Sequence, residues 1–131
     1  MRLLLDTHIW IWSVGASSRL SKRVSVALGD SANELWLSPI SIWELTILNA
    51  KGRTASVGRI EDWIENALRT SPLKEAPLTF EVALATNRFR PQHRDPADAF
   101  LAATAKVYDL TLVTADAELL ASKEIATLAN R

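Results

Sequence analysis

The stretch RDPADAFLAATA, residues 94–105, joins two carboxylates to a run of almost purely apolar side chains. Asp95 and Asp98 stand three residues apart, with Pro96 between them. Proline fits the first position of a helix, and aspartate is a preferred residue just before it. The pattern predicts a long, mostly buried helix over Pro96–Tyr108 whose start carries two acids. These acids either cap the helix or bind a metal ion, and the rest of the chain decides between the two.

The composition is that of one ordinary domain, which we expect to span residues 1–131. Fifteen basic residues balance 15 acidic residues, so the zero net charge argues against a strongly basic nucleic-acid coat protein. It still allows an enzyme that holds RNA through a local basic patch. The chain has no cysteine and only two histidines, which excludes thiolate zinc sites and disfavours His-rich ones. Any metal is therefore expected to be a hard cation on oxygen ligands, such as Mg²⁺ or Mn²⁺.

The amino-terminal segment MRLLLDTHIW contains a short apolar run that Asp6 interrupts after three leucines. Such a run is too short for a signal peptide or a membrane span. We therefore expect a cytoplasmic protein with no membrane partner.

Strand and helix patterns alternate along the chain. Short apolar runs predict strands at Leu3–Leu5, Leu35–Leu37, Leu73–Ala76, Leu110–Val113 and Ile125–Leu128. Helical spacing and cap residues predict helices at Thr7–Val14, Leu20–Leu28, Ser41–Lys51, Ile60–Leu68, Thr79–Thr86, Pro96–Tyr108 and Ala117–Ala121. This alternation predicts an α/β fold with three layers, in which helices cover both faces of a mainly parallel sheet of four to five strands. Ligands of such sheets bind beyond the carboxyl ends of the strands.

Acidic residues fall where this fold builds its sites. Asp6 ends the first strand and Asp116 follows the LTLV strand, so the two meet if those strands are neighbours. Glu44 and Asp98 are both expected in the first turn of a helix that begins at the same edge of the sheet. Two bare carboxylates about 4 Å apart repel by roughly 4 kcal/mol at an effective dielectric constant near 20. A cleft with four acids therefore needs either raised pKa values or a divalent cation.

Most of these acids also have a purely structural interpretation. Asp95 suits a helix N-cap, Asp98 suits the helix dipole, and Asp116 suits the cap of the short helix that follows it. Ser41 and Glu44 match a capping box. In this alternative the chain is a non-catalytic α/β binding module whose acids are helix caps. A phospho-acceptor receiver domain also clusters acids at strand ends, but no evident lysine after a late strand completes such a site here.

A basic run precedes the acidic helix. No acid lies between Val82 and Arg94, and the run itself consists of Arg88, Arg90, His93 and Arg94. Such a run is either a solvated loop or a surface that holds an RNA backbone through phosphate contacts.

Four motifs together resemble the PIN domain family, and more narrowly its VapC-type toxins of bacterial and archaeal toxin–antitoxin pairs. They are LLLDTHIWIW, SPISIWEL, HRDPADAFLAATA and LTLVTAD, and they follow the family's order from Leu3 to Asp116. The resemblance implies an α/β/α fold, a Mg²⁺- or Mn²⁺-dependent endoribonuclease that cleaves RNA with a metal-activated water, a homodimer, and neutralisation by a VapB-like antitoxin. By position it assigns the catalytic and metal-binding roles to Asp6, Glu44, Asp98 and Asp116. Secondary roles at the site fall to Asp95, Thr7 and Thr114.

The resemblance also suggests where a partner binds and marks one departure. An antitoxin tail is expected to lay apolar side chains near Trp10, Trp12 and Trp43 and to insert an arginine among the acids. Trp10 and Trp12 are two residues apart, cannot face the same side of a helix, and so one of them is expected to be exposed. Arginine often follows the Asp98 position in this group, whereas this chain has Ala99. A basic contact there is either missing or supplied by residues 88–94.

Overall fold

A single all-parallel sheet forms the centre of the protein, whose computed structural model describes residues 1–52 and 58–131. The strands are β1 (Arg2–Leu5), β2 (Glu34–Leu37), β3 (Leu73–Glu75), β4 (Thr111–Thr114) and β5 (Ala126–Ala129). Their order in the sheet is β3-β2-β1-β4-β5, and every neighbouring pair is parallel. The predicted fold class, a mainly parallel sheet of four to five strands between helices, is confirmed.

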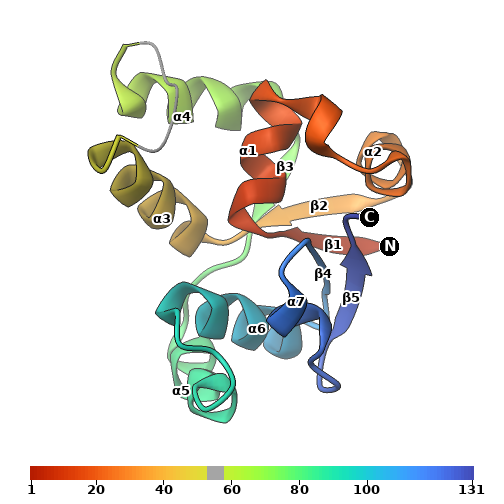
Figure 1. Cartoon of the computed structure of the whole chain (residues 1–131), viewed down its shortest axis with the longest axis vertical. Helices are drawn as coiled ribbons and strands as arrows, with labels where there is room; N and C mark the ends of the chain where they lie inside the picture. The colour runs from red at the N-terminus through yellow and green to blue at the C-terminus, as the bar shows by residue number, and fades with distance from the viewer. Residues whose placement is uncertain (53–57) are drawn as a thin grey trace.

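Helices cover both faces of the sheet (Figure 1). They are α1 (Thr7–Gly15), α2 (Lys22–Gly29), α3 (Pro39–Ala50), α4 (Ile60–Thr70), α5 (Phe80–Phe89), α6 (Pro96–Tyr108) and α7 (Ala117–Leu120), with a short 3₁₀ turn at Ser17–Arg19. Figure 1 shows α1 and α4 on one side of the sheet and α5 and α6 on the other. Across the described ranges 1–52 and 58–131, none of the helices has the length and apolar character needed to cross a membrane.

The two faces of the sheet build two hydrophobic cores because successive strand residues point to opposite sides. Leu3 and Leu5 are buried on the face that packs against α1, α2 and α4, where Trp10 is also buried. Leu4 is buried on the other face, against α5 and the alanine-rich side of α6. Full burial of a leucine side chain contributes roughly 1.5–3 kcal/mol. The continuous apolar run in β1 is therefore explained by its central position, where both of its faces are covered.

Capping residues set the helix boundaries. The Ser38 side chain accepts a hydrogen bond from the backbone N–H of Ile40 at 3.1 Å, and Pro39 takes the first position of α3. The predicted start at Ser41 was therefore two residues late, and the predicted capping box of Ser41 and Glu44 is wrong. Glu44 lies in the second turn of α3, not the first, because the stronger start signal is the Ser38-Pro39 pair.

The order of the strands reverses between β1 and β4, since β2 and β3 lie to one side of this pair and β5 to the other. Leu5 pairs with Val113, and the backbone N–H of Asp6 donates to the Val113 carbonyl at 3.0 Å. A reversal of this kind opens a crevice at the carboxyl ends of the strands. Asp6 and Thr114 therefore stand next to each other at the position where α/β proteins bind their ligands.

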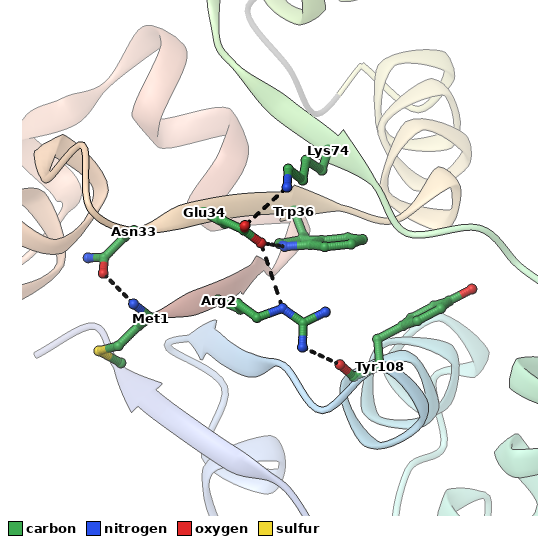
Figure 2. A network of polar contacts seen from close by, with 7 residues as sticks. All are labelled: Met1, Arg2, Asn33, Glu34, Trp36, Lys74 and Tyr108. Atoms are coloured by element: carbon green, nitrogen blue, oxygen red, sulfur yellow. Dashed lines mark hydrogen bonds and ion pairs between the residues drawn. The ribbon is translucent and has the colours of Figure 1, made fainter.

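A polar network lies toward the amino ends of the central strands, away from this crevice (Figure 2). The Glu34 carboxylate lies 3.1 Å from the Lys74 Nζ and 3.7 Å from the Arg2 Nε, and it accepts from the Trp36 Nε1 at 3.2 Å. Arg2 also donates to the Tyr108 carbonyl, and the Tyr108 ring stacks on Trp36. The hydrogen bond from Lys74 is the main cause that lowers the pKa of Glu34. The network ties β1, β2 and β3 to the end of α6.

Candidate acidic active site

Asp6 stands just beyond the carboxyl end of β1. The Thr114 hydroxyl donates a hydrogen bond to the Asp6 Oδ2 at 2.6 Å, and the same hydroxyl accepts from the backbone N–H of Asp116 at 3.0 Å. One threonine on β4 therefore links two acids that are 110 positions apart in the sequence. Burial raises the pKa of Asp6, and the hydrogen bond from Thr114 partly offsets this rise.

Asp98 lies in the first turn of α6, half-buried and facing the other acids. Its pKa is raised to about 7, first by burial and then by the negative charges of Asp95, Asp116, Asp6 and Glu44. In the part of the chain that the structure describes, the Asp98 carboxyl has no hydrogen-bond partner. Because acids from three other segments, Asp6, Glu44 and Asp116, raise its pKa, the predicted site acids lie in one electrostatic neighbourhood.

Glu44 reaches this neighbourhood from the second turn of α3. Burial is the largest cause that raises its pKa, and the charges of Asp95 and Asp6 add to it. A hydrogen bond from the Thr7 side chain acts in the opposite direction. The Thr7 and Ser41 hydroxyls lie 2.9 Å apart, and both residues are fully buried. This contact joins α1 to α3 and fixes Glu44 relative to the end of β1.

The donor set suits a hard divalent cation, since it consists of carboxylate oxygens that repel one another. Within residues 1–52 and 58–131, however, no three acidic or histidine side chains come close enough to hold one ion together. Asp6, Glu44, Asp98 and Asp116 therefore affect one another through their charges, but their carboxylates do not surround a common point. Binding of one ion by three of them therefore requires rotation of their side chains.

Two of the acids are helix caps, as the structural interpretation predicted. Asp95 accepts from the Ala97 N–H at 2.9 Å, and the Asp116 Oδ1 accepts from the N–H groups of Glu118 and Leu119 at 2.8 and 3.1 Å. Both Asp116 bonds use Oδ1, so its other oxygen is not engaged by the cap. Asp6 precedes α1 but makes no side-chain capping bond. Capping therefore accounts for Asp95 and Asp116 and leaves Asp6, Glu44 and Asp98 unexplained.

The basic run before α6 divides into exposed and buried residues. Arg90 and Arg94 are exposed, and Arg88 is exposed while paired with Glu124 at 3.1 Å. His93 is only 3% exposed, and neither of its ring nitrogens has a hydrogen-bond partner or contacts solvent. The expectation that His93 contacts RNA phosphates is corrected, because its ring is buried, with Nδ1 4.0 Å from the Glu118 carboxylate. Ala99 is buried as well, so the exposed positive charge near this end of α6 comes from the arginines.

The tryptophans expected to meet a partner are not equally available. Trp10 is 1% exposed and packs edge-on against Trp63 at 5.7 Å between ring centroids. Trp12 is partly buried, with the Arg19 guanidinium 4.7 Å above its ring. Trp43 is 51% exposed. Of the three tryptophans expected to meet a partner, Trp43 and part of Trp12 are therefore accessible, and the burial of Trp10 contradicts its expected contact.

The sequence pattern predicted the wrong role for Ser41, and His8 lies near the acids although the predicted site residues do not include it. Ser41 is fully buried against Thr7, although its spacing from Glu44 suggested a cap. The positive charge of His8, when protonated, lowers the pKa of both Asp6 and Glu44. The signal for His8 was its place two residues after the acid that ends the first strand.

The fold and the acids define a class of protein: a three-layer α/β domain with a cluster of carboxylates at the strand-order reversal of a parallel sheet. The chain matches the family model of the PIN domain over residues 3–124. The chain therefore belongs to the PIN domain family. No curated protein sequence matches it.

Solved structures with the same fold include several toxin–antitoxin complexes. The chain is similar to a chain of VapBC2 from Rickettsia felis, bound to a promoter DNA fragment, with a TM-score of 0.74, 17% identity and 98% coverage of both chains. The DNA-bound VapBC of Salmonella typhimurium gives a TM-score of 0.68 at 17% identity, again with 98% of both chains covered. VapBC-5 of Mycobacterium tuberculosis gives 0.63 at 19% identity, with 99% of this chain and 98% of that one covered. At these identities the likeness concerns the fold.

Proposed function

We propose that this chain is a divalent-metal-dependent endoribonuclease, the VapC-type toxin of a toxin–antitoxin pair. The observation that carries the proposal is the environment of Asp98. Three acids on other segments, Asp6, Glu44 and Asp116, raise its pKa together with burial and with the neighbouring Asp95. Helix capping gives no reason for such an arrangement, whereas a shared cation neutralises it.

Membership of the PIN domain family supports nuclease activity, because PIN domains are nucleases and generally use divalent metals. The motifs around Asp6, Glu44, Asp98 and Asp116 resemble those of VapC-type toxins. The fold is shared with chains of VapBC complexes. These likenesses favour a toxin over other nucleases of the same fold.

The proposed cation is Mg²⁺ or Mn²⁺, held by Asp6, Glu44, Asp98 and Asp116. When bound, it would lower the pKa of water and stabilise negative charge on phosphate oxygens. Thr114 orients Asp6, and the Thr7–Ser41 contact orients Glu44, as neighbours of ligands do in other metal sites.

The remaining roles belong to the chain itself. Arg90 and Arg94 hold the RNA backbone through its phosphates. In hydrolysis the oxygen of a water molecule bonds to phosphorus while the bond from phosphorus to the leaving ribose oxygen breaks. A carboxylate of the cluster accepts the proton that the water releases, and the leaving ribose oxygen takes up a proton from solvent.

The proposed partners are an RNA substrate, a VapB-like antitoxin and a second copy of the chain. Trp43 offers the antitoxin an exposed aromatic ring in the residue before Glu44. An arginine of the antitoxin placed among the acids would inhibit by occupying the position of the cation.

Cleavage of a mixed RNA pool, with and without Mn²⁺, tests the proposal. The purified chain should cut RNA only with the metal, Asp6→Asn and Asp98→Asn should lose the activity, and Asp62→Asn should keep it. Asp62 is the matched control because it is an exposed aspartate on α4, away from the cluster. Retained turnover in Asp6→Asn contradicts the mechanism. Absence of both cleavage and metal binding favours the non-catalytic binding module.

A further inference from the structure

A cavity open to solvent lies between the segment that joins α5 to α6 and the segment that joins α7 to β5. Its volume is about 500 Å³, which is in the range of small-molecule sites. Phe89 and Ala121 contribute apolar surface to its lining, and His93 and Glu118 contribute polar groups. The cavity therefore combines apolar surface with a few polar groups, as ligand sites do.

The imidazole of His93 has no partner in this cavity. Its side chain is 1% exposed, and within the described residues neither ring nitrogen has a hydrogen-bond partner. Buried polar atoms are normally hydrogen-bonded, because burial without a partner is unfavourable. Nδ1 lies 4.0 Å from the Glu118 Oε2, which is beyond hydrogen-bond distance. The two groups are therefore placed to bind a common ligand and do not bond to each other.

The chemistry of these two groups selects the ligand. A neutral imidazole has one donor and one acceptor nitrogen, and the carboxylate beside Nδ1 favours the tautomer with the proton there. The cavity then offers one donor, from His93, next to the two acceptor oxygens of Glu118. The Watson–Crick edge of guanine has the complementary order, with the O6 acceptor followed by the N1–H and N2–H₂ donors. Adenine, cytosine and uracil each have a single donor group on this edge, so they leave one carboxylate oxygen without a partner.

We propose that this cavity is a guanine subsite, in which His93 and Glu118 bind the Watson–Crick edge of a guanine base of the RNA substrate. This inference rests on the proposed function, because it takes RNA to be the substrate. Glu118 lies two residues after Asp116 on α7, and His93 lies between Arg90 and Arg94, the proposed phosphate contacts. The guanine subsite therefore adjoins both the acids and the residues that hold the RNA backbone.

Other occupants fit the cavity less well. In the described ranges, His93 and Glu118 belong to no group of three acidic or histidine side chains that could hold a metal ion. A phosphate would meet two carboxylates, of Glu118 and Glu124, against one lysine, Lys123. The Glu118 side chain is 64% exposed, so it can rotate to admit a base to the buried Nδ1. Proteins read single-stranded RNA in this way, through unstacked bases that hydrogen-bond on their Watson–Crick edges.

Titration of mononucleotides into the purified chain in EDTA, followed by NMR, tests the base preference. Guanosine monophosphate (GMP) should bind about tenfold more tightly than inosine monophosphate (IMP), which lacks only the 2-amino group. In Glu118→Gln this preference should disappear, because an amide cannot accept two hydrogen bonds from the base. Glu81→Gln is the matched control, since Glu81 is also an exposed acid in the first turn of a helix, and it should keep the preference.

The same comparison in RNA identifies the source of the base. A single-stranded oligonucleotide with one guanosine should bind about tenfold more tightly, in EDTA, than the same oligonucleotide with inosine. Glu118→Gln should remove this difference. His93→Leu should weaken the binding of both oligonucleotides, because guanosine and inosine share the O6 acceptor. Circular dichroism checks the fold of each variant, and the Glu118 comparison stands even if the buried His93 substitution unfolds the protein.

Equal affinities for GMP and IMP in the unmodified chain overturn the guanine subsite, as does an unchanged preference in Glu118→Gln. A preference for GMP without any preference between the two oligonucleotides assigns the cavity to a free nucleotide and overturns its role in RNA binding. All of these measurements are made without metal, so they do not depend on cleavage. A chain that prefers guanosine in RNA but never cuts RNA contradicts the proposed nuclease activity alone.

Discussion

The Thr114 hydroxyl donates to the Asp6 carboxylate at 2.6 Å, across the two strands where the order of the sheet reverses. Because this hydroxyl also accepts from the Asp116 backbone, its single proton is committed to Asp6. The contact fixes which way the Asp6 carboxylate turns. Thr114 is therefore the residue through which β4 positions the acid that follows β1.

Thr114→Val should therefore weaken the site without removing an acid. Loss of a residue that orients a ligand typically lowers metal affinity by about 10- to 100-fold, and the unpaired Asp6 and Asp116 groups should lower the free energy of unfolding by ~1–2 kcal/mol. Calorimetric titration with Mn²⁺ and urea unfolding measure the two effects. Thr111→Val, on the same strand but away from the acids, is the control. Equal metal affinity in the two variants would show that Thr114 has no positioning role.

Asp116→Ser separates the capping role of this residue from its proposed metal-binding role. Serine caps helices about as well as aspartate, so the free energy of unfolding should stay within ~0.5 kcal/mol of the parent value. Metal-dependent cleavage should fall by at least about 100-fold, because a carboxylate is lost. Asp95→Ser, whose carboxyl caps α6, should keep both stability and most of the activity. An Asp116→Ser variant that is stable and fully active would mean that Asp116 is only a cap.

Asp98→Asn should stabilise the metal-free protein at neutral and higher pH. Its folded-state pKa of about 7 lies above its ordinary value, so the folded state holds more protons at intermediate pH and stability falls as the pH rises toward 7. Each pKa unit is worth ~1.4 kcal/mol, but solvent screening of this partly exposed group reduces the gain to an expected ~1–2 kcal/mol at about pH 8. At about pH 4 the variant and parent should be nearly equal. Thermal unfolding in EDTA at both pH values measures this difference, and a variant less stable than its parent at about pH 8 would contradict it.

Arg90→Ala and Arg94→Ala should weaken RNA binding through the loss of phosphate contacts. Each should lower the slope of log affinity against log salt concentration by about 0.7, as expected for one contact to a single strand. Binding to a labelled RNA, in the Asp6→Asn background that prevents cleavage, measures this slope. Arg69→Ala, an exposed arginine on α4, should leave it unchanged. An unchanged slope in both test variants places the RNA elsewhere on the protein.

Local sequence patterns predicted the fold well because most elements carry their own signals. Pro96 with its capping Asp95 marks the start of α6, and the apolar run of β1 indicates a strand buried on both faces. Asp6 and Asp116 were expected to meet if their strands were neighbours, and β1 and β4 do pair. The predicted start of α3 was wrong because both Ser38 and Ser41 are suitable N-cap residues. Ser38 is the actual N-cap, and Pro39 after it occupies the first helical position.

Tertiary contacts decided what the local patterns left open. Ser41 is buried in contact with Thr7, and His93 is buried, so neither is where its spacing or charge suggested. The order of charged and apolar residues in α5 likewise does not predict that the Phe80 and Leu84 side chains are exposed. Those orientations depend on which side of the helix meets α6.

Calorimetric titration of Mn²⁺ into the purified chain tests the central claim, that acids from separate segments form one cation site. The account predicts that the unmodified chain binds Mn²⁺, that Asp98→Asn loses most of this affinity, and that the exposed control Asp62→Asn retains it. Absence of binding to the unmodified chain, or equal binding to all three proteins, would contradict the shared site. Asp95 and Asp116 would then be explained by helix capping alone.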